Sequence, residues 1–174
     1  GQMAFTKDMR GSDSIYGLGG TTDRVHFFTK NGAPLGNTSS FGTQVSATYF
    51  KQDAYYGLSN YEGVETDVYA NALVNTMVRG GHNVDFGASF RYTDLEENLY
   101  STPYIGANQF ISNLQEGDLR ANFIKEEIVP GVFGQFNFIY DKIFVATAGV
   151  RYDYNSHYNK HIITPRLHFR WKIT

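Results

Sequence analysis

The chain has 174 residues, a net charge of −2 and no cysteine, which excludes disulfides and thiolate metal sites. It contains no basic run of the kind that binds nucleic acid, and no apolar stretch of the roughly 18 residues that a membrane helix needs. The 13 tyrosines, 14 phenylalanines and 18 glycines favour pleated β structure joined by tight turns.

The first forty residues carry the weakest pattern. Residues 1–20 have no steady period and are predicted to form a loop, which a short strand at 22–30 follows. Pro34 lies in a Gly-Ala-Pro run and predicts a turn after that strand. We therefore divide the chain into residues 1–40, a loop with a weak first strand, and residues 41–174, a continuous β segment.

The remainder is predicted to form six more strands, at 43–50, 64–78, 84–92, 132–140, 143–154 and 162–173. Gly80 and Gly81 supply the backbone freedom that a tight hairpin needs between two of them. Short turns are expected at 79–83 and 140–142, and longer connections at 52–61, 96–120 and 155–160. A helix is the alternative conformation only for residues 108–119.

These strands alternate with a period of two. In residues 143–154 the even positions are uncharged and mostly apolar, whereas the odd positions include Arg151 and Asp153. Successive side chains point to opposite faces of a strand, so each strand has one apolar and one charged face. Long strands of this kind, with tyrosines near their ends, are typical of a transmembrane β-barrel.

The predicted fold is therefore an all-β, antiparallel, up-and-down transmembrane barrel segment of about seven strands. Its short turns are expected to be periplasmic and its long loops extracellular. A soluble β-barrel would bury the same apolar faces and leave the charged faces in water. Alternation by itself does not decide between these two orientations.

This arrangement assigns two sets of candidate residues. The polar side chains expected to face the lumen, and to pair with one another, are Arg151, Asp153, Arg166, His168 and Arg170. Ligand-binding candidates come from the predicted extracellular loops, because binding residues concentrate on loops. They are Tyr100, Tyr104, Asn108 and Phe110 on one loop, and Tyr154, His157 and Tyr158 on another.

No pattern of residues predicts catalysis, a metal site or a cofactor. His157 and His161 are four apart, which is ligand spacing on a helix, but they flank a predicted strand start and are expected to be solvated. Glu126 and Glu127 are adjacent, so they point to opposite faces and cannot act as one carboxylate pair. The sequence therefore predicts a protein that is not an enzyme.

Three segments of the C-terminal part resemble a known family. The segments KEEIVPGVFGQFNF (125–138), GVRYDYNSHYN (149–159) and TPRLHFRW (164–171) together resemble TonB-dependent outer-membrane receptors. The similarity is greatest to the non-saccharide branch that is common in Bacteroidetes. YANALVNT (69–76) and DFGASFRYTD (85–94) are similar to an upstream hairpin of that family, so the resemblance covers residues 41–174.

The resemblance implies a location and an activity. Such receptors form barrels of about 22 strands that are filled by an N-terminal plug. They import scarce nutrients across the outer membrane, here a metal chelate, haem or a cobalamin-like ligand, with energy that the TonB complex passes to the plug. The implied partners are outer-membrane lipid, the TonB complex and a small-molecule nutrient.

The sequence also departs from the family pattern. It shows no plug-like segment, no TonB-contacting box at its start and no final aromatic residue, so we expect an internal piece of a receptor barrel. Two alternatives remain open at this point. One is a self-contained outer-membrane barrel of about eight strands for adhesion or passive diffusion. The other is a soluble β-barrel that binds a small apolar ligand, with its aromatic faces turned inward.

Overall fold

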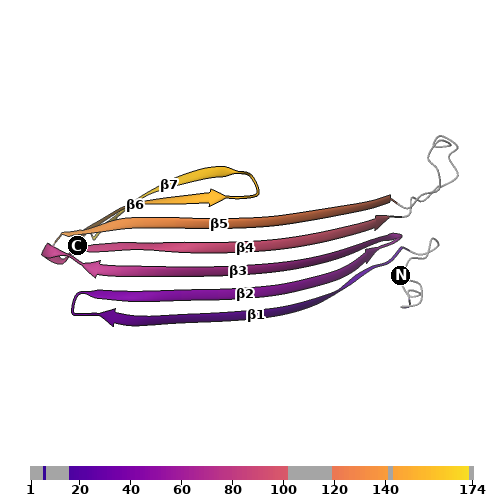
Figure 1. Cartoon of the computed structure of the whole chain (residues 1–174), viewed down its shortest axis with the longest axis horizontal. Coiled ribbons are helices and arrows are strands. Elements are labelled where there is room, and N and C mark those ends of the chain that lie inside the picture. The colour runs from indigo at the N-terminus through magenta and orange to yellow at the C-terminus, as the bar shows by residue number, and fades with distance from the viewer. Residues whose placement is uncertain (1–5, 7–15, 102–118, 141–142, 173–174) are drawn as a thin grey trace. The chain divides into compact units, whose positions relative to one another are not determined.

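The computed structural model describes residues 6, 16–101, 119–140 and 143–172, and its regular structure is seven β-strands and one short 3-10 turn. The elements are β1 (Leu18–Leu35), β2 (Ser39–Tyr56), β3 (Ser59–Met77), η2 (Arg79–Gly81), β4 (Asn83–Ser101), β5 (Leu119–Tyr140), β6 (Phe144–Asn155) and β7 (Lys160–Trp171). They form one sheet in chain order, from β1 to β7 (Figure 1). The predicted seven-stranded antiparallel meander is therefore confirmed.

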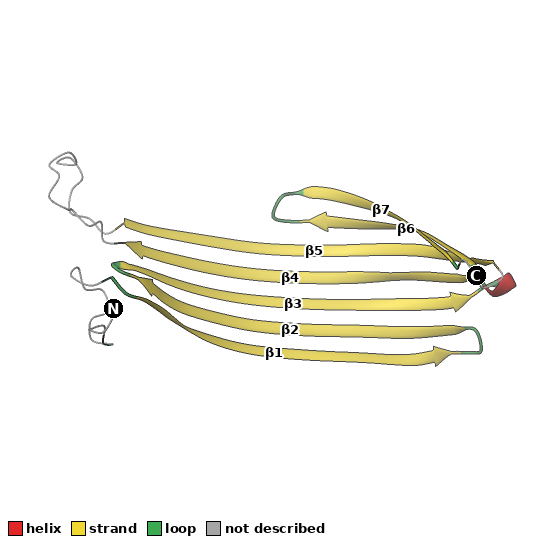
Figure 2. Ribbon diagram, turned by 180° about the vertical axis from the view of Figure 1, so that it is seen from behind, coloured by secondary structure: helices red, strands yellow, loops and turns green. Residues whose placement is uncertain are grey.

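Tight connections join most neighbouring strands (Figure 2). β1 and β2 are joined by residues 36–38, where Gly36 has a φ of +72°. The η2 turn joins β3 to β4, and Gly80 and Gly81 have φ values of +83° and +79° there, as the predicted hairpin requires. Residues 156–159 join β6 to β7, close to the predicted connection at 155–160.

Three sequence predictions about the strand ends were wrong. Residues 52–61 do not form a long connection, because β2 continues to Tyr56 and β3 begins at Ser59 after a tight turn at Gly57, whose φ is +60°. Residues 96–101 belong to β4, and β5 begins at Leu119 rather than near residue 132. The first strand has 18 residues and continues one residue past Pro34. A helix was the alternative conformation for residues 108–119, and of these residues 108–118 lie outside the described part of the chain.

The chain divides into two compact units, and five of the strands, β1 to β5, contribute to both. The first unit comprises Gly1–Val25, Thr48–Thr66 and Asp94–Lys125, and the second comprises His26–Ala47, Asp67–Thr93 and Glu126–Thr174. We describe each unit by itself.

The first unit carries charged groups on both faces of its strands. Lys51 forms ion pairs with Asp53 at 3.6 Å and with Glu62 at 3.4 Å. Tyr61, the neighbour of Glu62, donates a hydrogen bond to Glu97 at 2.7 Å. Because adjacent strand residues point to opposite faces, these contacts lie on opposite faces. The first unit therefore has no purely apolar face.

The second unit has one apolar face and one polar face. The pairing of β5 with β6 places Phe136 opposite Ala148, and the pairing of β6 with β7 places Ala148 opposite Leu167. On this face the large side chains are 38–72% exposed, among them Phe86, Phe90, Val132, Phe136, Phe138, Val150, Leu167, Phe169 and Trp171. Phe144 stacks on Phe169 at 6.1 Å and meets Trp171 edge-on at 6.4 Å.

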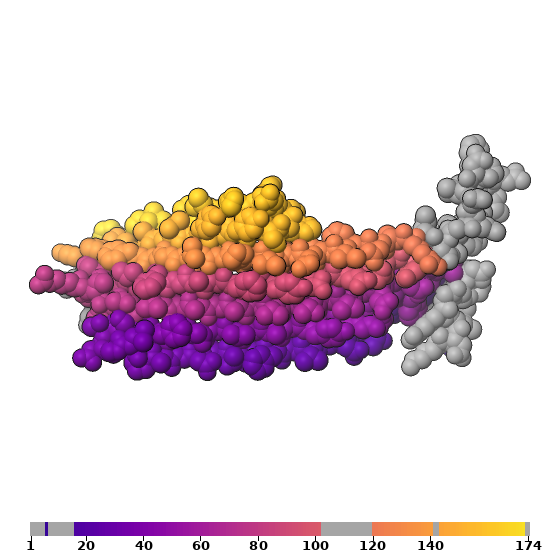
Figure 3. Space-filling view, in the orientation of Figure 1, coloured from indigo at the N-terminus to yellow at the C-terminus, as the bar shows by residue number. Residues whose placement is uncertain are grey.

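A conventional hydrophobic core is missing from the described residues. Ala54 is the one buried hydrophobic side chain there, and it is 8% exposed. The strands follow one another as adjacent bands across the face shown in Figure 3. Stability must therefore come from the backbone ladder, cross-strand pairs and the environment that covers the apolar face.

Candidate functional site

The polar face of the second unit holds a hydrogen-bonded belt centred on Asp85. The Asp85 carboxylate accepts hydrogen bonds from the side-chain amides of Asn75, of Gln135 at 2.7 Å and of Asn137 at 2.9 Å. Asn137 accepts in turn from the Thr147 hydroxyl at 2.7 Å. This belt, defined by these five residues, links β3, β4, β5 and β6 through side chains alone. The negative charge of Asp85 is therefore stabilised by neutral amide groups.

A second group on this face is an arginine cluster. Arg151 donates from Nε and Nη2 to the two oxygens of Asp153, at 2.7 and 2.6 Å, and from Nη2 to Ser89 at 2.7 Å. A bidentate pair of this kind has strong directional preference. The cluster can span β4, β5 and β6 because Gly131 leaves room: a Cβ there would lie 2.1 Å from Asp153 Oδ1 and 3.0 Å from Ser89 Oγ.

A separate ion pair lies nearby on β3 and β4. Arg91 Nε donates to Asp67 at 2.7 Å, and the Thr93 hydroxyl donates to the same carboxylate oxygen at 2.9 Å. A recess of about 500 Å³ is lined by both arginine–aspartate pairs, together with Tyr69 and Glu127 among others. The charges on this part of the face are therefore largely matched by charges of opposite sign.

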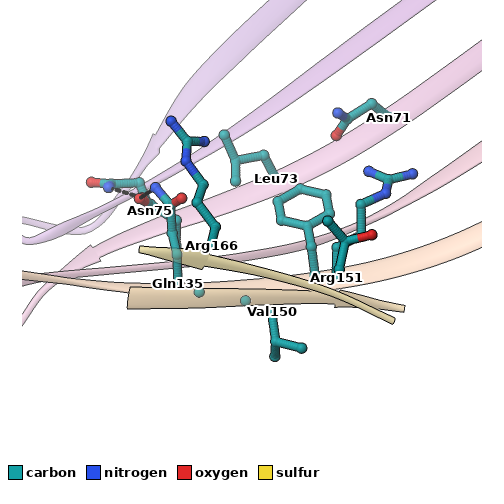
Figure 4. A pocket seen from close by; sticks show the side chains of 12 residues that line it. Asn71, Leu73, Asn75, Gln135, Val150, Arg151 and Arg166 are labelled. Carbon is teal, nitrogen blue, oxygen red and sulfur yellow. Dashed lines mark hydrogen bonds between the residues drawn. The ribbon is translucent and has the colours of Figure 1, made fainter. Parts of the chain in front are cut away.

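A recess of about 510 Å³ opens on the same face, and we call it the Gly149 recess. Gly149 pairs with Gln135 on one side and with Arg166 on the other, so the missing side chain leaves a gap between two long polar ones. A Cβ at this position would lie 2.8 Å from the Gln135 Cβ. In Figure 4 the Arg166 side chain extends toward Leu73 and Asn75, whereas Val150 points the opposite way.

An aromatic ring closes one side of the Gly149 recess. Phe133 contributes to its lining, and its ring lies beneath the Arg151 guanidinium, 5.9 Å from the ring centroid. The ring covers Gly87 of β4, where a Cβ would lie 2.7 Å from the tip of the ring and 2.2 Å from the Ala72 carbonyl oxygen. The recess therefore combines amides, one carboxylate, two guanidiniums and an apolar side.

The predicted polar set is distributed over this face. Arg151 and Asp153 form the expected pair, and Arg166 lines the Gly149 recess. His168 pairs with Thr147, and Arg170 with Val145, in the β6–β7 register. All five predicted residues therefore occupy alternate positions on their strands, as the sequence indicated. Two of them, Arg151 and Asp153, form an ion pair with each other.

The predicted ligand-binding residues do not form one site. Tyr104, Asn108 and Phe110 lie outside the described residues. Tyr100 belongs to the first unit, where its ring lies 5.3 Å from the Arg120 guanidinium.

The other three predicted ligand-binding residues lie at the β6–β7 turn of the second unit or beside it, Tyr154 near the end of β6 and His157 and Tyr158 in the turn. The Tyr154 hydroxyl donates to Asn159 at 3.0 Å, and its ring lies 5.1 Å from the His161 ring. His157 packs edge-on against Tyr158 at 4.9 Å. These contacts join residues of the turn to one another, and His157 and Tyr158 are exposed.

Sequence reasoning missed the belt around Asp85 and the role of Gly149. Both depend on which strands are neighbours and in what register, since Asp85 lies 50 residues from Gln135 along the chain. The one available signal was the occurrence of amide side chains at alternate strand positions, such as Asn71 and Asn75 or Gln135 and Asn137.

Two features are absent from the part of the chain that the structure describes. No helix there is long and apolar enough to cross a bilayer. No three side chains of the histidine, cysteine, aspartate or glutamate type come together there in a way that would hold a metal ion.

Comparison with known structures finds the following similarities. One is the RagAB peptide importer in its 'open-open' state, with 13% identity, a TM-score of 0.47, and coverage of 87% of this chain and 20% of that one. The RagAB peptide transporter has 12% identity, a TM-score of 0.45 and coverage of 86% and 20%. The 'closed-closed' state of the importer has 13% identity, a TM-score of 0.43 and coverage of 87% and 20%.

The chain thus spans about one fifth of the length of the structures that it matches. None of the curated proteins matches its sequence. A family-wide sequence profile, described as "TonB dependent receptor-like, beta-barrel", matches residues 5–174. This family comprises outer-membrane transport receptors rather than enzymes, and its barrels are larger than seven strands. The chain therefore belongs to the TonB-dependent receptor-like β-barrel family, of which it forms a seven-stranded part.

Proposed function

We propose that this chain is part of the wall of a receptor that imports a scarce nutrient, with the polar face of its second unit toward the lumen. The observation that carries the proposal is the contrast between the two faces. One face exposes Phe136, Val150, Leu167 and other large apolar side chains. On the other face, polar side chains form hydrogen bonds with one another in the Asp85 belt and the arginine cluster. Apolar side chains toward lipid and polar ones toward a lumen are the arrangement of membrane barrels.

The absence of a core in the described residues argues against a soluble binding module. A soluble barrel would cover its aromatic face, yet Leu167 is 67% exposed and Trp171 is 72% exposed. A contiguous exposed face of this kind is rare in soluble monomers unless something covers it. Lipid is the covering that suits a face made of phenylalanine, valine, leucine and tryptophan.

The lipid-facing band is confined to the second unit. In the first unit, Lys51 with Glu62 occupies one face and Tyr61 with Glu97 the other. Charged side chains on a lipid-facing surface destabilise a barrel by about 2–4 kcal/mol at the bilayer midplane. The strand segments of the first unit therefore lie in water, outside the hydrocarbon layer.

The nutrient class rests on the sequence motifs. The Gly149–Asp153 segment and the Thr-Pro-Arg run at residues 164–166 resemble the non-saccharide branch of the family, so we assign a metal chelate, haem or a cobalamin-like ligand. Energy would come from the TonB complex through the plug of the intact receptor. A peptide, the ligand named for the RagAB importer, is the alternative that the experiment must separate.

The test is nutrient-dependent growth and uptake. Cells lacking the intact receptor, and the same cells with the gene restored, would be supplied with a ferric chelate, haem, cobalamin or peptides as the limiting source. We expect a growth and uptake deficit with one of the first three, and loss of that uptake when a protonophore removes the inner-membrane energy. Receptor-dependent growth on peptides or on saccharides alone would show that the nutrient class is wrong.

The orientation of the faces has its own test. Val150→Arg places a charge on the exposed apolar face and should destabilise the receptor folded in lipid by about 2–4 kcal/mol. Asn60→Arg is the matched control, because Asn60 is an exposed residue of the first unit. This substitution should change stability by less than about 0.5 kcal/mol. Equal effects of the two substitutions in guanidinium unfolding would contradict the proposed lipid band.

A further inference from the structure

The Gly149 recess contains a guanidinium that no carboxylate of the described residues neutralises. Arg151 is paired with Asp153, and Arg91 with Asp67. In the part of the chain that the structure describes, Arg166 takes part in no ion pair. The nearby carboxylate of Asp85 accepts hydrogen bonds from three amides instead.

The opposite side of the recess is apolar, which is unusual for this face. Leu73 lies between Asn71 and Asn75 on the same face of β3. It is 36% exposed, although these two neighbours on that face are polar. Phe133 adds an aromatic surface to the same lining. Both Leu73 and Arg166 line this recess, and in Figure 4 the Arg166 side chain extends toward Leu73. The Arg166 guanidinium and the apolar side chains of Leu73 and Phe133 therefore line the same recess.

We propose that the Gly149 recess is a ligand subsite for a carboxylate attached to an apolar group. The carboxylate binds the fork of Arg166, whose planar donors match two carboxylate oxygens. The apolar group covers Leu73 and Phe133, and the Asn71 amide is available as a polar contact. The volume of about 510 Å³ lies within the range of small-molecule sites, about 300–1,000 Å³.

The charge balance favours a monoanion over a phosphate. Among the residues that the structure describes, Arg166 offers one positive charge without an ion-pair partner, and Asp85 lines the same recess. A dianionic phosphate would leave surplus negative charge next to that carboxylate, whereas a single carboxylate neutralises Arg166. This inference rests on the proposed function, because a solute reaches the recess only if the polar face borders the lumen.

The experiment measures binding to the intact purified receptor in detergent. The probe is N-acetyl-L-leucine, which carries a carboxylate beside an aliphatic group, and N-acetyl-L-leucinamide is its neutral counterpart. Arg166→Gln should weaken binding of the acid by about tenfold, since it removes hydrogen bonds to a charged group. Leu73→Asn should weaken it by a smaller factor, of about threefold to fivefold.

Arg170→Gln is the matched control, because it removes the same charge from the same strand and face, four residues away and outside the recess. It should leave the affinity unchanged, and the amide should bind more weakly than the acid. The proposal is overturned if wild type does not bind the acid, if acid and amide bind equally, or if the two arginine variants behave alike. Nutrient uptake in cells is measured separately, so a wild-type receptor that takes up its nutrient but does not bind the acid refutes the subsite and not the receptor function.

Discussion

Replacing Asp85 by alanine removes the acceptor at the centre of the belt. Three amide side chains, from Asn75, Gln135 and Asn137, donate to this carboxylate from two other strands. A hydrogen bond to a charged group is worth about 1.5–3 kcal/mol when it is shielded from water. These groups are part-buried, so we take about 0.5–1 kcal/mol for each, because water competes for the freed amides.

Three such bonds predict a loss of about 1.5–3 kcal/mol for Asp85→Ala in the free energy of unfolding. Asp94→Ala removes an exposed carboxylate from the same strand and should cost less than about 0.5 kcal/mol. Asp85→Asn keeps the shape and one acceptor oxygen but turns an NH₂ group toward amide donors, so its loss should be intermediate.

The assay is guanidinium unfolding of the intact receptor in phospholipid vesicles, compared at one lipid composition. The ranking Asp85→Ala, then Asp85→Asn, then Asp94→Ala is the expected order of destabilisation. If Asp85→Ala and Asp94→Ala fall within 0.5 kcal/mol of each other, about the resolution of such comparisons, the belt does not stabilise the sheet and the reasoning fails.

Two further predictions concern single positions on the polar faces. Gly131→Ala should cost about 1–3 kcal/mol, because its Cβ would meet the Asp153 carboxylate. Gly134→Ala, where the nearest atom is 3.9 Å away, should be tolerated in the same unfolding assay, and equal costs would refute the packing argument. The Glu97 carboxylate and, to a lesser degree, burial raise the pKa of Tyr61 to about 12. The associated stabilisation is present below the usual tyrosine pKa of about 10 and is lost as the pH rises through 12. Absorbance titration at alkaline pH should show this late ionisation, and Glu97→Gln should shift it to lower pH; an unchanged curve in that variant would rule out Glu97 as the cause.

The strands of the second unit were predictable because only one of their faces is polar. In β6, Arg151 and Asp153 mark one face while Ala148 and Val150 mark the other, so the period of two is visible in the sequence. Their positions two apart also predicted that both side chains lie on the same side. The pair then forms with the expected geometry.

Most strand segments of the first unit were missed because both of their faces are polar. Lys51 and Glu62 interact on one face, and Tyr61 and Glu97 on the other, so apolar and polar residues do not alternate there. The backbone ladder does not need that alternation, since it is made by main-chain groups. The Gly149 recess escaped prediction for a different reason: its shape comes from a side chain that is absent, between two partners that only the register reveals.

The short β6–β7 hairpin has a consequence for how deep the receptor sits in its membrane. Each of its strands has 12 residues, against 18 to 22 in the others. A strand tilted by about 40° rises about 2.5 Å per residue along the membrane normal, so 12 residues cover about 30 Å, close to the thickness of the hydrocarbon layer. Tyr152 and Tyr154 lie near one end of the hairpin and Trp171 near the other. Moving these two strands by one or two residues in either direction would draw the polar turn or Lys172 into hydrocarbon, so the length of the hairpin limits how far its own strands can shift along the membrane normal.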